Sequence, residues 1–125
     1  MKFAANSIVI LFFLLFFKSY AFESDSLFDL GNKALREKNY QLAQKVYTRY
    51  LNENPEHQNA RYNLALALFQ QKKATYCLEQ ILKINHWKKQ KKALSLGVWC
   101  AYQSGHVDSS LYWLELLPDD QKNKA

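Results

Sequence analysis

Residues 24–55 decide the fold, and they read SDSLFDLGNKALREKNYQLAQKVYTRYLNENP. Apolar residues recur in this stretch at offsets of three and four, the spacing that places side chains on one face of a helix. The polar segment 36–39 separates two such stripes. Asn54-Pro55 then ends the second stripe, because proline disfavours helical geometry in the residue before it. The stretch therefore predicts two helices joined by a short turn.

The same helix pair recurs twice more toward the C-terminus. When Lys38, Lys72 and Gly105 are aligned at the turn inside each pair, the period is about 34 residues, which is typical of stacked helical repeats. In this register, small residues share one column: Ala43, Cys77 and Ser110. Large apolar residues share two others, which are Tyr47, Ile81 and Leu114, and Tyr50, Ile84 and Leu117. Small columns let helices approach closely, and large ones fill the layer between pairs.

These patterns predict an all-α domain over residues 24–117. It consists of three stacked helix-turn-helix repeats forming a short solenoid, with boundaries at 24–57, 58–90 and 91–117, and a polar tail follows at 118–125. No strand-like alternation occurs in this region. Ser26 with Asp29 is similar to a helix-capping signal, so the first helix is expected to begin there.

Residues 1–21 have the layout of a secretory signal peptide. Lys2 precedes the apolar stretch 4–17, and the small residues Ser19 and Ala21 follow it. We expect cleavage after Ala21 and export. The alternative is an uncleaved membrane anchor, but the apolar run ends at Lys18, short of the ~20 residues that span a bilayer. The chain has no Asn-x-Ser/Thr sequon, which favours a periplasmic location.

The first repeat resembles the tetratricopeptide repeat family. The residues that carry the resemblance are Leu27, Leu30-Gly31, Ala34, Tyr40, Ala43, Tyr47 and Pro55. The second copy matches through Tyr62-Asn63-Leu64-Ala65, and the third has Gly97-Val98 in place of Leu-Gly. The resemblance implies a right-handed superhelix, a concave groove lined by the first helix of each pair, and a role in holding protein partners.

The resemblance also implies which residues line that groove. Asn32, Asn63 and Lys92 fall in columns that, in chaperone-binding members, hold the C-terminal carboxylate of a peptide through charge-assisted hydrogen bonds. However, Phe28 and Leu96 stand where basic residues belong in such members. The expected apolar lining suits apolar or helical ligands better, and it consists of Phe28, Leu35, Tyr62, Leu66 and Phe69.

Cys77 and Cys100 leave two possibilities open. Both could be free and buried, because cysteine packs as a small hydrophobic residue. Alternatively, an exported protein could pair them, since disulfides persist in oxidising compartments. Such a bond would join the second repeat to the third and contribute about 3 kcal/mol.

The stretch 83–92 is strongly basic. It contains His86, Trp87 and the lysines Lys83, Lys88, Lys89, Lys91 and Lys92. One interpretation is a peripheral membrane protein that binds anionic lipid here, with Trp87 as an anchor. The other is a solvated loop between repeats, whose lysines offset the dipole of the preceding helix. Removal of Lys2 and Lys18 with the signal peptide lowers the formal net charge from +6 to +4, and a surplus of this size does not by itself indicate nucleic acid binding.

Catalytic and metal motifs are absent from the sequence. His57, His86 and His106 are scattered, and none lies in a metal-binding spacing. The few glycines are isolated, so no phosphate-binding loop is formed. Cys100 and His106 could suggest a nucleophile and base, but a helix turn is expected between them. We therefore expect no enzyme, cofactor or metal.

The last expected helix, residues 107–117, is apolar on more than one face. Trp113 and Leu116 are expected on its open side, because the tail is too short and too polar to cover them. Exposed apolar patches of this kind mark interfaces, with a second copy or with a partner. Together, these features predict an exported protein-interaction module, an adaptor in a cell-envelope assembly.

Overall fold

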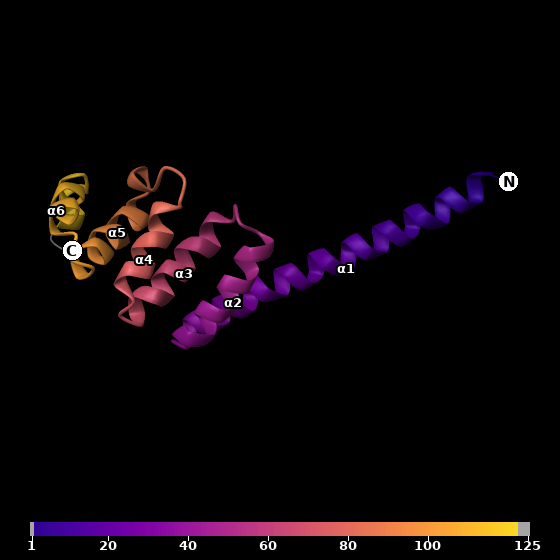
Figure 1. Ribbon diagram of the computed structural model, residues 1–125, viewed down its shortest axis with the longest axis horizontal. Coiled ribbons are helices and arrows are strands. Elements are labelled where there is room, and N and C mark those ends of the chain that lie inside the picture. The colour runs from indigo at the N-terminus through magenta and orange to yellow at the C-terminus, as the bar shows by residue number, and fades with distance from the viewer. Residues whose placement is uncertain (1, 123–125) are drawn as a thin grey trace.

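Three helix pairs follow one another along the chain in the computed structural model, which describes the backbone of residues 2–122 and the side chains of 8–15, 26–120 and 122. The pairs are α1 (Lys2–Arg36) with α2 (Tyr40–Glu53), α3 (Gln58–Gln70) with α4 (Ala74–Leu82), and α5 (Lys91–Gln103) with α6 (Val107–Glu115). A 3-10 turn, η1 (Trp87–Lys89), precedes α5, and the short α7 (Asp119–Lys122) follows α6. Residues 2–122 contain no strand. The expected all-α repeat solenoid is confirmed (Figure 1).

The turn inside each pair has the same backbone conformation. Lys38, Lys72 and Gly105 all have positive φ, at 58°, 61° and 87°. The residue after each of them donates its amide to a carbonyl five residues earlier: Asn39 to Ala34 at 2.8 Å, Lys73 to Leu68 at 3.0 Å and His106 to Ala101 at 2.8 Å. This bond and the left-handed residue form the Schellman motif that ends a helix. The alignment on these three positions is therefore correct.

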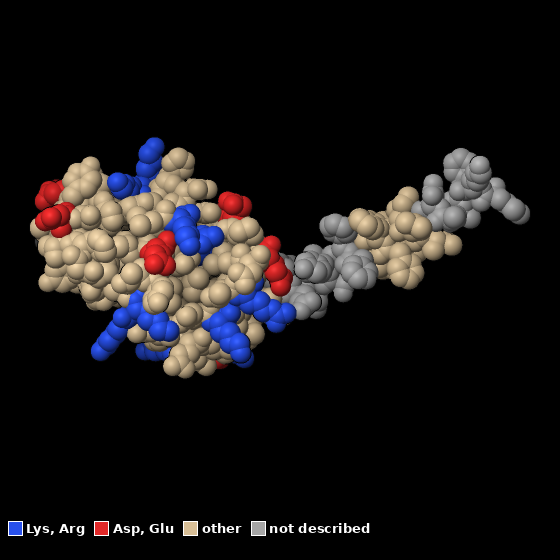
Figure 2. Space-filling model, viewed as in Figure 1, with Lys and Arg blue, Asp and Glu red and all other residues tan. Residues whose placement is uncertain are grey.

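Figure 2 shows Lys and Arg gathered along the lower edge of the repeats. This is the side on which the α1–α2 and α3–α4 turns lie in Figure 1.

The predicted columns of the repeat are also found in the core. The small column is buried throughout, with Ala43 and Cys77 fully buried and Ser110 nearly so. Ser110 can be buried because its hydroxyl donates to the Val98 carbonyl at 3.0 Å, which satisfies a polar group that burial would otherwise destabilise. Small side chains here let the two helices of each pair pack closely.

The first repeat differs from the second on the face that a preceding repeat would cover. Leu30 and Leu64 occupy equivalent positions, yet Leu30 is 42% exposed and Leu64 only 5%. Leu64 lies between the first and second pairs, whereas no described helix pair precedes α1. The apolar stripe of the first repeat therefore includes a position, Leu30, that is not buried. A terminal repeat lacks the neighbour that buries its outer face.

A disulfide joins the second and third repeats. Cys77 of α4 is bonded to Cys100 of α5, with 6.0 Å between their Cα atoms. Both residues are fully buried. Of the two possibilities that the sequence left open, the structure has the disulfide and not the free thiols.

The first helix is longer than expected. The capping signal at Ser26 predicted a start there, but α1 is continuous from Lys2 to Arg36. The sequence contains no proline or glycine before Gly31 that would break it. Along residues 8–15 the side chains are all exposed, and the N-terminal part of α1 projects beyond the repeats (Figure 1). The proposed cleavage site after Ala21 lies among residues whose side chains the structure does not describe. Within the described part of the chain, no helix is both long and apolar enough to span a bilayer.

Candidate protein-interaction groove

A groove of about 410 Å³ lies between α3 and α5, the first helices of the second and third pairs. It is lined by Tyr62, Lys91, Lys92, Ser95, Leu96 and Trp99. The α5 residues recur at offsets of three and four, so they share one face of that helix. The groove thus has an aromatic and aliphatic floor with lysines at its rim, a combination that suits an apolar peptide segment carrying a negative charge.

Local hydrogen bonds fix the ends of the two helices that form the groove. At the start of α3, the His57 ring accepts through Nδ1 from the Ala60 amide at 3.1 Å. The Gln58 side chain then accepts from the Asn85 amide at 2.8 Å, which ties α3 to the loop before α5. Gln90 in turn donates to the Asn85 carbonyl at 2.8 Å. The loop 83–90 is therefore tied to α3 through Asn85 and closed by its internal Gln90–Asn85 bond just before α5 begins.

The two rim lysines differ in their electrostatic state. Lys91 forms an ion pair with Asp120 of α7 at 3.0 Å. Lys92 is exposed and forms no ion pair with any described residue. Lys92 is therefore the cation available to a ligand in this groove.

Burial raises the pKa of Tyr62 above its ordinary value of 10.0, because the apolar floor of the groove disfavours a charged phenolate.

Asn32 and Asn63 hold the first two repeats together. Asn32 Oδ1 accepts from the Tyr47 hydroxyl at 2.7 Å and from Asn63 Nδ2 at 3.1 Å. Asn63 Nδ2 also donates to the Tyr47 hydroxyl at 3.1 Å. The two bonds from Asn63 Nδ2 occupy the amide donor that a carboxylate clamp would need from this residue, and none of these bonds includes Lys92. The arrangement of Asn32, Asn63 and Lys92 therefore gives no support to carboxylate capture.

The other residues expected in the groove pack mainly into the core. Phe28 contacts three rings, with centroid distances of 6.2 Å to Tyr47, 5.3 Å to Tyr50 and 4.8 Å to His57. Leu35, Leu66 and Phe69 are half-buried against the core cluster. None of these four residues lines the groove between α3 and α5. Of the eight expected groove residues, the structure brings together only Tyr62 and Lys92.

Sequence reasoning missed Trp99 and Ser95 as lining residues. Trp99 lies seven positions after Lys92, which is two helical turns along the same face. This spacing in the sequence indicates that the two residues share one face of α5. In the repeat register, Leu96 stands where chaperone-binding members of the family have a basic residue. It is 7% exposed and forms part of the groove floor.

The open edge at the C-terminal end is formed by different residues from those expected. Leu116 is exposed, as expected. Trp113 is half-buried, because its ring packs edge-on against Trp87 with centroids 4.7 Å apart. The assignment of Trp113 to the open side was therefore wrong. The exposed apolar residues of α6 are Val107, Leu111 and Tyr112, and Leu116 follows the helix.

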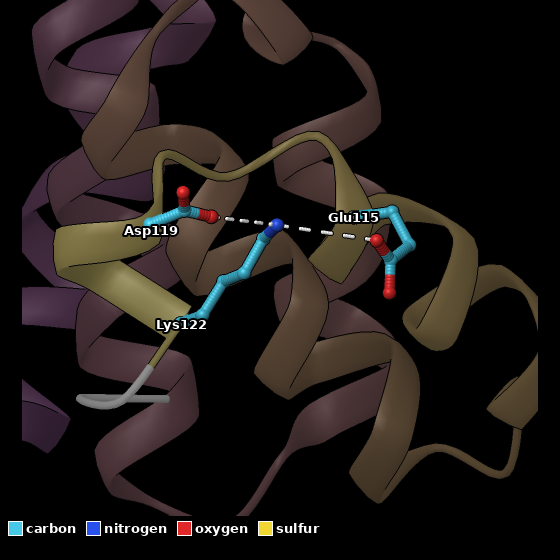
Figure 3. A network of polar contacts seen from close by, with 3 residues as sticks. All are labelled: Glu115, Asp119 and Lys122. Carbon is cyan, nitrogen blue, oxygen red and sulfur yellow. Dashed lines mark hydrogen bonds and ion pairs between the residues drawn. The ribbon is translucent and has the colours of Figure 1, made fainter.

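The tail is more structured than its polarity suggested. Lys122 of α7 donates to Asp119 at 3.0 Å and lies 3.9 Å from Glu115 at the end of α6 (Figure 3). The bond to Asp119 raises the pKa of Lys122. With the Lys91–Asp120 pair, these contacts fold the tail against the third repeat. The exposed side chains on α6 nevertheless remain accessible.

The basic stretch 83–92 does not present an aromatic anchor. Trp87 is only 8% exposed, because it packs against Trp113 and against the backbone of Gly97. This packing does not support the interpretation in which Trp87 anchors the chain in a lipid surface. Lys88 covers this aromatic cluster, with its ammonium 5.6 Å from the centroid of the Trp87 ring.

Two candidates for chemistry are also resolved by the structure. Cys100 is bonded to Cys77, so it offers no thiol to pair with His106. The His106 ring instead lies within hydrogen-bonding distance of Ser104, at 3.0 Å. Within the residues that the structure describes, no group of three or more His, Cys, Asp or Glu side chains could hold a metal ion.

Comparison with known proteins agrees with the repeat geometry. No curated protein matches the chain. A family model described as tetratricopeptide repeat matches residues 34–96, which run from the end of the first helix to the middle of α5. That range contains the α1–α2 and α3–α4 turns, the two buried small residues Ala43 and Cys77, and Tyr62 and Lys92 of the groove. The chain belongs to the tetratricopeptide repeat family.

Proposed function

We propose that this chain is an exported protein-interaction module that acts as an adaptor in a cell-envelope assembly. Tetratricopeptide repeats in general mediate protein–protein interaction, and the family is typically non-catalytic. The finer proposal concerns where the partner binds and where the protein works. We place the partner in the groove between α3 and α5.

The observation that carries this proposal is the combination of Trp99, Tyr62 and Leu96 with Lys92 in one groove. Aromatic residues dominate binding energy at protein interfaces because they desolvate a large area with few rotatable bonds. Lys92 adds a cation that no described carboxylate neutralises. We infer that the partner contributes an apolar segment with an acidic residue beside it.

Site-specific cross-linking tests the location of the partner. A photoreactive phenylalanine analogue at Ser95, inside the groove, should capture a partner in the cells that produce the protein. The same analogue at Thr75, exposed on α4 and outside the groove, should not. Trp99→Ala should abolish capture from position 95. Equal capture from both positions, or capture from 95 that Trp99→Ala leaves intact, contradicts the proposal.

Two observations support export. The apolar residues 8–15 are exposed and make up a segment that the repeats do not bury. The buried Cys77–Cys100 bond fits an oxidising compartment, because cytosolic proteins rarely keep structural disulfides.

Processing gives the direct test of export. The mature protein should begin at Phe22, and Ala21→Leu should prevent cleavage, because the residue before the cut must be small. N-terminal sequencing of the protein recovered from cells distinguishes the outcomes. A mature chain that still begins at Met1 contradicts the proposal.

A further inference from the structure

A second groove, of about 570 Å³, lies on another side of the repeats between α2, α3 and α4. Its walls are lined by Gln44, Thr48, Leu51, Asn52, Arg61, Leu64, Leu68, Lys73, Tyr76, Gln80 and Lys83. The proposed function does not use this groove. It shares α3 with the first groove, but Arg61 and Tyr62 are neighbours in a helix and point about 100° apart.

Every charged residue that lines this second groove is a cation. Arg61, Lys73 and Lys83 contribute positive charge, and no carboxylate belongs to the lining. The remaining polar groups are three amides, a threonine hydroxyl and the Tyr76 hydroxyl, which can donate or accept hydrogen bonds. The groove therefore presents uncompensated positive charge beside hydrogen-bonding groups.

Arg61 is held in place without being neutralised. Its Nη1 donates to Gln80 Oε1 at 3.1 Å, and its Nη2 donates to the Pro55 carbonyl. Its buried Nε has no partner among the described residues. Both acceptors are neutral, so the guanidinium is oriented while its charge remains available. An oriented cation binds an anion with a smaller loss of side-chain entropy than a mobile one.

The distance between Lys73 and Lys83 indicates how long a segment bound in the groove would be. Lys73 and Lys83 are the N-cap and C-cap residues of α4, and the helix between them has nine residues. At a rise of 1.5 Å per residue, their backbones are about 15 Å apart. Lys73 donates to Gln44 at 2.9 Å, again a neutral acceptor. An extended chain advances about 3.3 Å per residue, so about five residues span this distance.

We propose that the groove between α2 and α4 binds an extended, acidic segment of a partner protein. One carboxylate of the segment contacts Arg61 and Lys83, and another contacts Lys73 at the opposite end. The apolar side chains between them, Leu51, Leu64 and Tyr76, contact the middle of the segment. A compact anion would engage only one end, whereas cations at both ends of a partly apolar groove match a peptide with separated acidic residues.

Fluorescence anisotropy tests this proposal with the protein purified after expression of the full chain. The probe is a labelled, amidated peptide with glutamates at both ends and leucine and serine between them. The matched probe has glutamine in place of every glutamate. The variants are Lys73→Glu and Lys83→Glu, with Lys45→Glu as the control, because Lys45 is exposed on α2 but does not line the groove.

The expected result is salt-sensitive binding of the glutamate peptide, weakened about tenfold by each of Lys73→Glu and Lys83→Glu. Lys45→Glu and the groove variant Trp99→Ala should leave this binding within about twofold. Equal binding of the glutamine peptide, equal weakening by Lys45→Glu, or the absence of binding at low salt overturns the proposal. Direct binding of anionic phospholipid vesicles that depends on Lys73 and Lys83, without binding of the glutamate peptide, identifies a lipid ligand and overturns the proposal as well.

Discussion

Gly31 and Tyr47 lie so close together that the glycine has no room for a side chain. A Cβ built on Gly31 would lie 2.7 Å from Cε1 of the Tyr47 ring and 2.9 Å from its Cζ. Tyr47 is fully buried, so its ring cannot swing away into solvent. This contact brings α1 against α2, and it places the Tyr47 hydroxyl where Asn32 and Asn63 meet.

Gly31→Ala should destabilise the protein despite the higher helix propensity of alanine. Overpacking costs about 1–3 kcal/mol, and the propensity gain offsets about 1 kcal/mol. Urea denaturation should show a lower midpoint for Gly31→Ala and little change for Lys33→Ala, which is exposed on the same helix. If Gly31→Ala is as stable as the wild type, Tyr47 does not pack as closely as described.

The left-handed turn residues predict opposite effects for two substitutions. Lys38→Gly should stabilise the protein by about 0.5–1 kcal/mol, because a residue with a side chain is strained at φ 58°. Gly105→Ala should cost about 1 kcal/mol from backbone strain alone, since nothing lies within 4 Å of its Cβ position. Lys33→Gly, within helix α1, is the control and should destabilise. Thermal unfolding of the three variants compares them directly.

Tyr47→Phe should lower the free energy of unfolding by about 1–2 kcal/mol. The substitution removes the hydroxyl that bonds to Asn32 and Asn63, so each of these half-buried amides loses one hydrogen bond and keeps only the bond to the other. Tyr102→Phe, on an exposed ring, is the matched control. Equal stability of the two variants would show that the hydroxyl does not hold the first two repeats together.

Alkaline pH should destabilise the protein through Tyr47 and Tyr62. Burial raises the pKa of both above 10.0, although the bond from Asn63 and the charge of Arg36 partly lower that of Tyr47. The unfolded chain therefore loses these protons first, so stability is full below pH 10 and falls as the pH rises toward the folded-state values. Tyr47→Phe with Tyr62→Phe should show a shallower fall in urea midpoint above pH 10 than the wild type. If the urea midpoint of the double variant falls with pH as steeply as that of the wild type, the prediction is contradicted.

Loss of the Cys77–Cys100 bond should cost about 3 kcal/mol, the value expected for closing a loop of this length. Thiol titration of the unfolded, unreduced protein should find no free thiol, and after reduction it should find both. The double substitution Cys77→Ala with Cys100→Ala should have the same stability in oxidising and reducing buffer. Detection of free thiols before reduction would show that the cysteines are unpaired.

Trp113 and Leu116 should respond differently to substitution. Trp113→Ala removes the contact with Trp87 and should lower the free energy of unfolding by about 2 kcal/mol. Leu111→Ser with Leu116→Ser removes exposed apolar surface and should change stability by less than about 1 kcal/mol. We expect light scattering to show that the wild type self-associates through the α6 edge and that this double variant, unlike Trp113→Ala, weakens the association. If Trp113→Ala weakens self-association and the double variant does not, Trp113 lies on the open side of α6.

The sequence by itself determined the repeat. Lys38, Lys72 and Gly105 could be aligned, and Ala43, Cys77 and Ser110 placed in one buried column, because helical spacing and chain reversal are local properties repeated at a fixed interval. The tetratricopeptide resemblance followed from the same residues. The sequence also shows no helix breaker before Gly31, which agrees with the continuous α1 better than the capping signal at Ser26 does.

Only the tertiary structure decided how each side chain is used. The Trp113 ring packs against Trp87, and Asn32 bonds to Asn63 across two repeats. Arg61 is oriented by its bonds to Gln80 and to the Pro55 carbonyl. Apart from the Arg61–Pro55 bond, each of these contacts joins side chains on different helices. A helical period fixes which face a residue occupies, but not whether the neighbouring helix offers a ring, an amide or open solvent. That choice depends on helix packing, which brings together side chains that no local pattern relates.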